Sequence, residues 1–86
     1  MKRDENEPIQ AALTLCMMRG FTGSADGVTE RSDSGEALLP QDLVIKALGL
    51  SRSGVRDLMD DGRLREVVCS DGISRVGGWS FVDYVY

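Results

Sequence analysis

Two cysteines and one pair of adjacent aspartates are the side chains of this 86-residue chain whose types suit catalysis or metal binding. Cys16 and Cys69 lie far apart in a sequence without an export signal, so we expect free thiols. The chain has no His, and two cysteines do not complete a zinc site. Asp60 and Asp61 are adjacent and do not face each other across a substrate. We therefore predict that the protein is not an enzyme and has no cofactor or metal.

The stretch from Gln41 to Leu64, QDLVIKALGLSRSGVRDLMDDGRL, predicts two short amphipathic helices joined by a tight turn. Gly49 is expected to end the first helix, and Ser51 to cap the second. Apolar residues recur at helical spacing in both: Val44, Ile45 and Leu48 in the first, and Val55, Leu58 and Met59 in the second. The outward side of the second helix is then polar and of mixed charge: Arg52, Ser53, Arg56, Asp57 and Asp60.

The segment LGLSRSGVRDLMDDGRL resembles the helix-turn-helix of the excisionase and MerR-like winged-helix families, over about residues 39–68. The likeness rests on a Leu-Gly-apolar-Ser turn, on Ser-Arg-Ser-x-Val at the start of the second helix and on a Gly-Arg-Leu exit. It implies that the second helix lies in the major groove of DNA and that a β-hairpin wing touches the neighbouring backbone or minor groove. The residues that the resemblance places at DNA are Ser51, Arg52, Ser53 and Arg56 on the helix, and Arg63, Arg65 and Arg75 at phosphates.

The residues after the second helix predict the hairpin independently of the family resemblance. Leu64–Ser70 and Ile73–Trp79 are short, apolar-rich runs, and the Asp71-Gly72 pair between them is a strong hairpin signal. We assign residues 63–79 to this wing. Residues 80–86 suit a short closing helix or an extended end. Three aromatic residues are expected to cover the core: Trp79, Phe81 and Tyr84.

The first 39 residues lie outside the resemblance. Residues 1–7 form a charged tail that we expect to be disordered, and residues 21–38 predict a flexible loop, with a binding loop as the alternative. Residues 8–20 predict a helix with an apolar stripe of Ile9, Ala12, Leu13, Cys16 and Met17. Three more apolar positions make this helix apolar nearly all round, so it is either central to the core or covered by a protein partner: Ala11, Leu15 and Met18.

These elements predict one domain over residues 8–86, of α+β and mainly helical class. The expected architecture is a winged helix-turn-helix domain, with the helix-turn-helix itself at residues 39–62, an extra N-terminal helix and a small β-hairpin wing. No run approaches the roughly 20 apolar residues of a membrane span, and the N-terminus is charged. We therefore expect a soluble, cytoplasmic protein.

Charge opposes a role in DNA binding. The chain carries 14 acidic against 10 basic side chains, and Asp57, Asp60 and Asp61 lie on or just after the predicted DNA-reading helix. The family pattern also usually has a small residue where this chain has Ile45. We hypothesise that Gly54 supplies the room that Ile45 takes.

Two function hypotheses follow. The leading one is a small sequence-specific DNA-binding protein, a transcriptional regulator or excisionase-type recombination factor of a mobile element or phage, which pairs as a homodimer or hetero-assembly through its N-terminal helix. The alternative is a helix-turn-helix fold used as an acidic protein-binding inhibitor or adaptor of a host machine, including mimicry of nucleic acid.

Overall fold

The computed structural model describes residues 6–21, 31–32 and 35–86 of the chain. These residues form four helices and a three-stranded antiparallel sheet, in the order α1 (Glu7–Met18), β1 (Leu38–Pro40), α2 (Gln41–Leu48), α3 (Arg52–Asp60), β2 (Glu66–Val68), β3 (Ser74–Gly77) and α4 (Gly78–Val85). The prediction of an α+β, mainly helical chain is confirmed. Residues 1–5 of the predicted disordered tail and residues 22–30 and 33–34 of the predicted flexible loop lie outside the described residues. The ends of these two predicted segments are wrong, because Glu7 belongs to α1 and Leu38 to β1.

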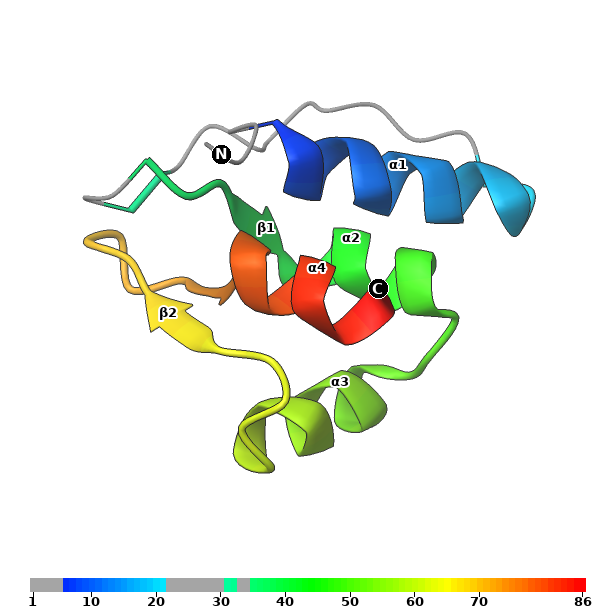
Figure 1. Cartoon of the computed structure of the whole chain (residues 1–86). Helices are drawn as coiled ribbons and strands as arrows, with labels where there is room; N and C mark the ends of the chain where they lie inside the picture. The colour runs from blue at the N-terminus through cyan, green and yellow to red at the C-terminus, as the bar shows by residue number, and fades with distance from the viewer. Residues whose placement is uncertain (1–5, 22–30, 33–34) are drawn as a thin grey trace.

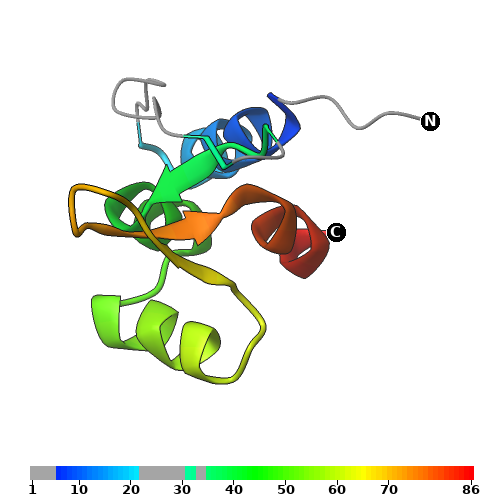
Figure 2. The same cartoon turned by 90° about the vertical axis from the view of Figure 1, so that its left-hand side faces the viewer.

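The helices are arranged around the sheet. In both views α1 lies above the level of the sheet and of α2, and α3 lies below it (Figure 1 and Figure 2). Helix α1 packs against α2 and α4, whereas α3 packs against α2. The core between them contains side chains with no exposed surface from every layer: Ala12, Val44, Ala47, Val55, Leu64, Val76 and Phe81. Burial of these residues is the main term that stabilises the fold.

The sheet has the order β1-β3-β2. The predicted hairpin is confirmed: β2 and β3 pair with Glu66 opposite Val76, and Gly72 turns between them at φ +79°. Strand β1 was not predicted, because Leu38–Pro40 is short and was divided between the loop and the helix-turn-helix. Pro40 has no N–H to donate, so it suits an edge strand such as β1.

The turn between α2 and α3 follows the prediction. Gly49 ends α2 in the left-handed conformation, with φ +68°. Ser51 caps α3, since its Oγ accepts a hydrogen bond of 3.1 Å from the backbone N–H of Gly54.

Arg19, just after α1, donates from Nε to the carbonyl oxygen of Ala47 at 2.9 Å. The N-terminal helix is thereby attached to the end of α2.

Helix α1 is confirmed, but its apolar surface is distributed differently from the prediction. Ala11 is 4% exposed, so it lies in the core rather than at a partner surface, whereas Leu15 is partly buried against the core. Met17 was assigned to the core stripe but is 72% exposed, and Met18 is 77% exposed. The reason is tertiary: α2 and α4 both contact α1, so a wide face is buried along the helix up to Cys16, which has no exposed surface.

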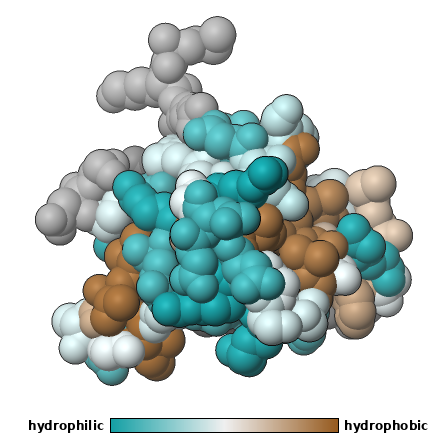
Figure 3. Space-filling view, turned by 90° about the horizontal axis from the view of Figure 1, so that it is seen from below, coloured by the Kyte–Doolittle hydropathy of each residue, from teal (hydrophilic) through white to brown (hydrophobic). Residues whose placement is uncertain are grey.

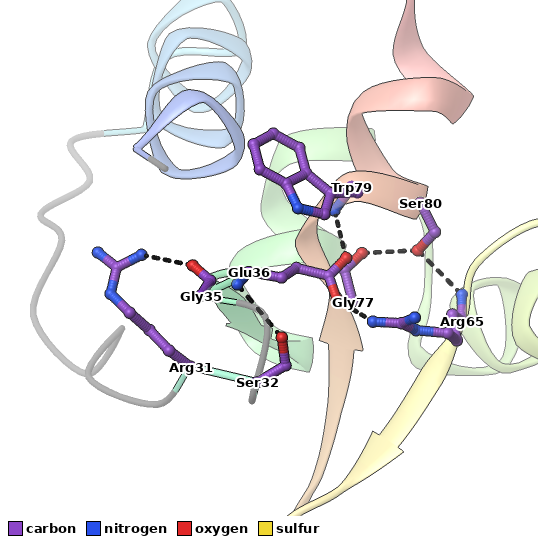
Figure 4. Close-up of polar contacts among 8 residues, drawn as sticks. All are labelled: Arg31, Ser32, Gly35, Glu36, Arg65, Gly77, Trp79 and Ser80. Carbon is purple, nitrogen blue, oxygen red and sulfur yellow. Dashed lines mark hydrogen bonds and ion pairs between the residues drawn. The ribbon is translucent and has the colours of Figure 1, made fainter. Parts of the chain in front are cut away.

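A buried carboxylate fixes the start of α4. Glu36 is 2% exposed; its carboxylate accepts a hydrogen bond of 2.8 Å from the backbone N–H of Trp79 and pairs with the guanidinium of Arg65 (Figure 4). Negative charge is favourable at this end of a helix. The helix begins at Gly78 rather than at residue 80, because the Gly78 N–H donates to the carbonyl oxygen of Ala37 at 2.9 Å. Strand β1, the start of β2 and α4 therefore meet at Glu36.

The aromatic residues of the C-terminal segment are less uniformly buried than predicted. Phe81 has no exposed surface and Trp79 is half-buried, as expected of core cover. Tyr84 is 40% exposed, so its assignment to the core is wrong. Tyr84 lies two residues after the buried Val82, a rotation of about 200°, and so lies nearly opposite that residue on α4.

Candidate nucleic-acid interface

Helix α3 presents a polar surface on one side of the molecule. Val55 and Met59, 0% and 8% exposed, hold its apolar side on the body of the protein. Seen from the side on which α3 lies, hydrophilic side chains gather over the centre of the surface and apolar ones lie on both flanks (Figure 3). Helix α3 and the adjacent hairpin are the place where the resemblance predicts DNA.

The two arginines of α3 do not lie at the outermost line of the helix. Successive residues of an α-helix turn by about 100°, so Ser53 and Asp57, two residues before and after Val55, lie nearly opposite this buried residue. Arg52 and Arg56 lie on one flank. We call Ser53, Asp57 and Asp60 the outer line of α3; all three are exposed.

Both flanking arginines are paired with carboxylates from other elements. Arg52 Nη2 lies 2.7 Å from Asp42 Oδ1 of α2, and Arg56 Nη1 lies 2.6 Å from Glu66 Oε2 of β2. Arg56 Nε also lies 3.6 Å from Asp60 Oδ1, one turn further along α3. The side chains of Arg52, Asp42 and Arg56 are more than half exposed, and that of Glu66 is 31% exposed. Ion pairs that are open to water in this way are weak enough to be exchanged for phosphate.

Glu66 joins α3 to the hairpin. Its Oε2 accepts hydrogen bonds from Ser74 Oγ at 2.5 Å and from Arg56. The Ser74 hydroxyl and then the Arg56 guanidinium lower the pKa of the Glu66 carboxyl, so this carboxylate is charged at neutral pH. As the pH falls through this lowered pKa, the carboxylate is neutralised and the link between the helix and the hairpin weakens.

Two of the arginines predicted to bind phosphates, Arg65 and Arg75, form ion pairs with carboxylates outside α3. Arg75 donates to both carboxylate oxygens of Asp71, at 3.2 and 3.1 Å, and its side chain is 12% exposed. Asp71 and Cys69 raise the pKa of Arg75, whose guanidinium in turn lowers the pKa of Asp71. Arg65 pairs with the buried Glu36. Arg63, in the turn after α3, is exposed and makes no ion pair with a described residue.

The carboxylates of other elements that pair with Arg52 and Arg56 were missed by sequence reasoning. Asp42 and Glu66 are each ten residues from their arginines. Such spacing carries no helical or strand periodicity, so no local signal could have paired them. The atoms nearest to a Cβ at Gly54 belong to Leu50 and Ser51, so the hypothesis that Gly54 makes room for Ile45 gains no support from this contact.

The cysteines and carboxylates of the described residues do not gather into a metal site. Cys16 and Cys69 are free thiols, as predicted, and burial raises the pKa of Cys16. The described ranges contain no group of three His, Cys, Asp or Glu side chains able to hold a metal ion. Within the same ranges, no helix has the length and apolarity required to cross a bilayer.

Comparison with protein-family models, curated proteins and solved structures gave no match.

Proposed function

We propose that this chain is a winged helix-turn-helix protein that binds DNA through α3 and the β2–β3 hairpin. The observation that carries the proposal is the placement of α3: its apolar side is buried on the body, its polar side is exposed, and Arg56 and Glu66 join it to the neighbouring hairpin. A helix of this kind fits the major groove, and a hairpin beside it reaches the adjacent backbone. The order β1, α2, α3, β2, β3 supports the same architecture.

The ion pairs of Arg52 and Arg56 determine how strongly such a protein would bind the phosphates of DNA. Asp42 and Glu66 already occupy Arg52 and Arg56, so phosphates have to replace these carboxylates before the arginines contribute to binding. Arg63 needs no such exchange with a described residue. Affinity for random DNA is therefore low and the salt dependence shallow, because few cations are free to displace counterions.

Removing the competing carboxylate tests this proposal. Asp42→Asn is expected to raise the affinity for fragmented duplex DNA on the order of fivefold at low salt and to steepen the log–log salt slope by up to about 0.9, the value of one phosphate contact. Arg52→Ala is expected to lower the affinity for duplex DNA and to make the salt slope shallower. Fluorescence anisotropy across a salt series measures both quantities. Absence of binding by the wild type at low salt would sink the proposal.

A second candidate function is contact with a protein. Met17, Met18 and Phe21 form an exposed apolar group at the end of α1, with 72%, 77% and 46% of their surfaces accessible. Methionine side chains adapt readily to a partner. The net charge of −4 also favours a protein over DNA as the partner. We propose that an inhibitor or adaptor role uses this end of α1.

A charge substitution tests the second candidate. Immobilised wild-type chain is expected to retain one defined protein from a nuclease-treated lysate, and Met18→Lys is expected to abolish retention, because the lysine ammonium cannot be buried unpaired in an interface. Thr14→Lys is the matched control, because Thr14 lies on an exposed part of α1 and the variant introduces the same charge. A change at Ala11 would not serve as a control, since Ala11 lies in the core. Equal retention by both lysine variants contradicts the assignment.

A further inference from the structure

The outer line of α3 carries carboxylates where a DNA-reading helix commonly carries cations. Ser53 and Asp57 lie nearly opposite Val55, and Asp60 lies one turn beyond Arg56. If α3 enters a groove, these residues reach the base edges first, and Arg52 and Arg56 remain at the flank toward the phosphates. The chemistry of the outer line then decides which bases are accepted.

The three residues of the outer line differ in the ion pairs and hydrogen bonds that their side chains make. Asp60 pairs with Arg56 Nε at 3.6 Å, and Ser53 Oγ lies 3.0 Å from Ser51 Oγ. Asp57 is exposed, and its carboxylate has no ion pair with any described residue. It is thus the carboxylate of this line that is free to accept a hydrogen bond from a ligand.

A carboxylate accepts hydrogen bonds and donates none, so it selects among base edges by their amino groups. In the major groove, guanine and thymine present acceptors, which repel it, whereas cytosine and adenine present an amino group. Adenine also presents the N7 acceptor next to its amino group, which repels the second carboxylate oxygen. Cytosine N4 is therefore the best partner for Asp57.

We propose that Asp57 is a specificity-determining residue that selects cytosine at one position of the DNA site by accepting a hydrogen bond from its N4 amino group. The inference rests on the proposed DNA-binding function. It gives a physical reason for an acidic side chain on this helix: the unfavourable field of Asp57 weakens binding to every sequence, and the cytosine contact offsets that loss at one sequence. The residue contributes selectivity at the expense of affinity.

Selection from a randomised duplex library tests the inference with the full chain and two charge-matched variants. Asp57→Asn and Asp61→Asn each remove one exposed carboxylate, but Asp61 lies beyond the end of α3. Both variants are expected to bind random DNA more tightly. Asp57→Asn alone is expected to lose cytosine preference at one position by about fivefold or more and to favour adenine there, because an amide pairs with adenine N6 and N7.

The outcomes separate the two proposals. A wild-type chain that binds DNA and shows the same base preferences as both variants overturns the role of Asp57 and leaves DNA binding intact. A wild-type chain that binds no duplex at low salt overturns the DNA-binding function, and the role of Asp57 with it. A cytosine preference that moves to adenine in Asp57→Asn and stays in Asp61→Asn supports both.

Discussion

Replacing Gly78 with alanine is expected to lower the free energy of unfolding by about 3 kcal/mol, enough to leave a domain of this size barely folded. A Cβ at position 78 would lie 2.4 Å from the carbonyl oxygen of Ala37 and 2.7 Å from Pro8 Cβ. The oxygen cannot retreat, because it accepts the Gly78 N–H itself at 2.9 Å. The three elements that meet at Gly78, namely α1, β1 and α4, would have to separate.

Gly54→Ala is the matched control, since Gly54 also lies inside a helix. A Cβ there would lie 3.4 Å from Leu50 Cβ and 3.5 Å from Ser51 Oγ, which are ordinary contacts. Alanine is the better helix former, so this variant is expected to gain up to about 1 kcal/mol. Urea denaturation of both variants measures the difference. If Gly78→Ala were as stable as wild type, the close approach of α1 to α4 would be wrong.

Removing the partner of Glu36 is expected to cost more than removing the charge of Glu36. Arg65→Ala leaves a carboxylate that is 2% exposed without its guanidinium, for a loss of about 3 kcal/mol. Glu36→Gln retains an oxygen that accepts the Trp79 N–H and leaves Arg65, whose side chain is 57% exposed, to be solvated. We expect a loss of about 1 kcal/mol for that variant.

The double variant Glu36→Gln, Arg65→Ala completes the thermodynamic cycle. It is expected to be more stable than Arg65→Ala alone, because the glutamine needs no counter-charge in the buried position. Denaturant unfolding of all four proteins measures the coupling free energy. Arg52→Ala, which breaks a largely exposed pair with Asp42, is the control and should change stability little. Additive losses in the cycle would show that Glu36 and Arg65 do not act as a pair.

Local chemistry was sufficient to predict most helices and the hairpin. Gly49 has the left-handed conformation and Ser51 has the capping hydrogen bond that the sequence indicated. The Asp71-Gly72 turn formed as expected, since glycine allows a positive φ at no steric cost. These features depend on residues within a few positions of each other, which is why a single sequence reveals them.

Prediction failed where contacts join distant segments. Glu36 stands in a Gly- and Ser-rich stretch that is typical of a solvated loop, and it is buried because its carboxylate accepts the N–H of Trp79, 43 residues later in the first turn of α4. Strand β1 was missed because Leu38–Pro40 becomes a strand by pairing with β3. Met17 was placed in the core by periodicity, but α2 and α4 cover another side of α1 and leave Met17 72% exposed.

The sequence by itself determined the helices α2 and α3, the turn between them, the hairpin and the residues of α3 that face outward, because helical periodicity and turn chemistry are local. The tertiary structure alone decided the state of the arginines. Arg52, Arg56, Arg65 and Arg75 are all cations in the sequence, but each lies beside a carboxylate that belongs to another segment of the chain or to the hairpin turn. Ion pairing depends on distances in space, and these are set when α2, α3 and the hairpin pack together.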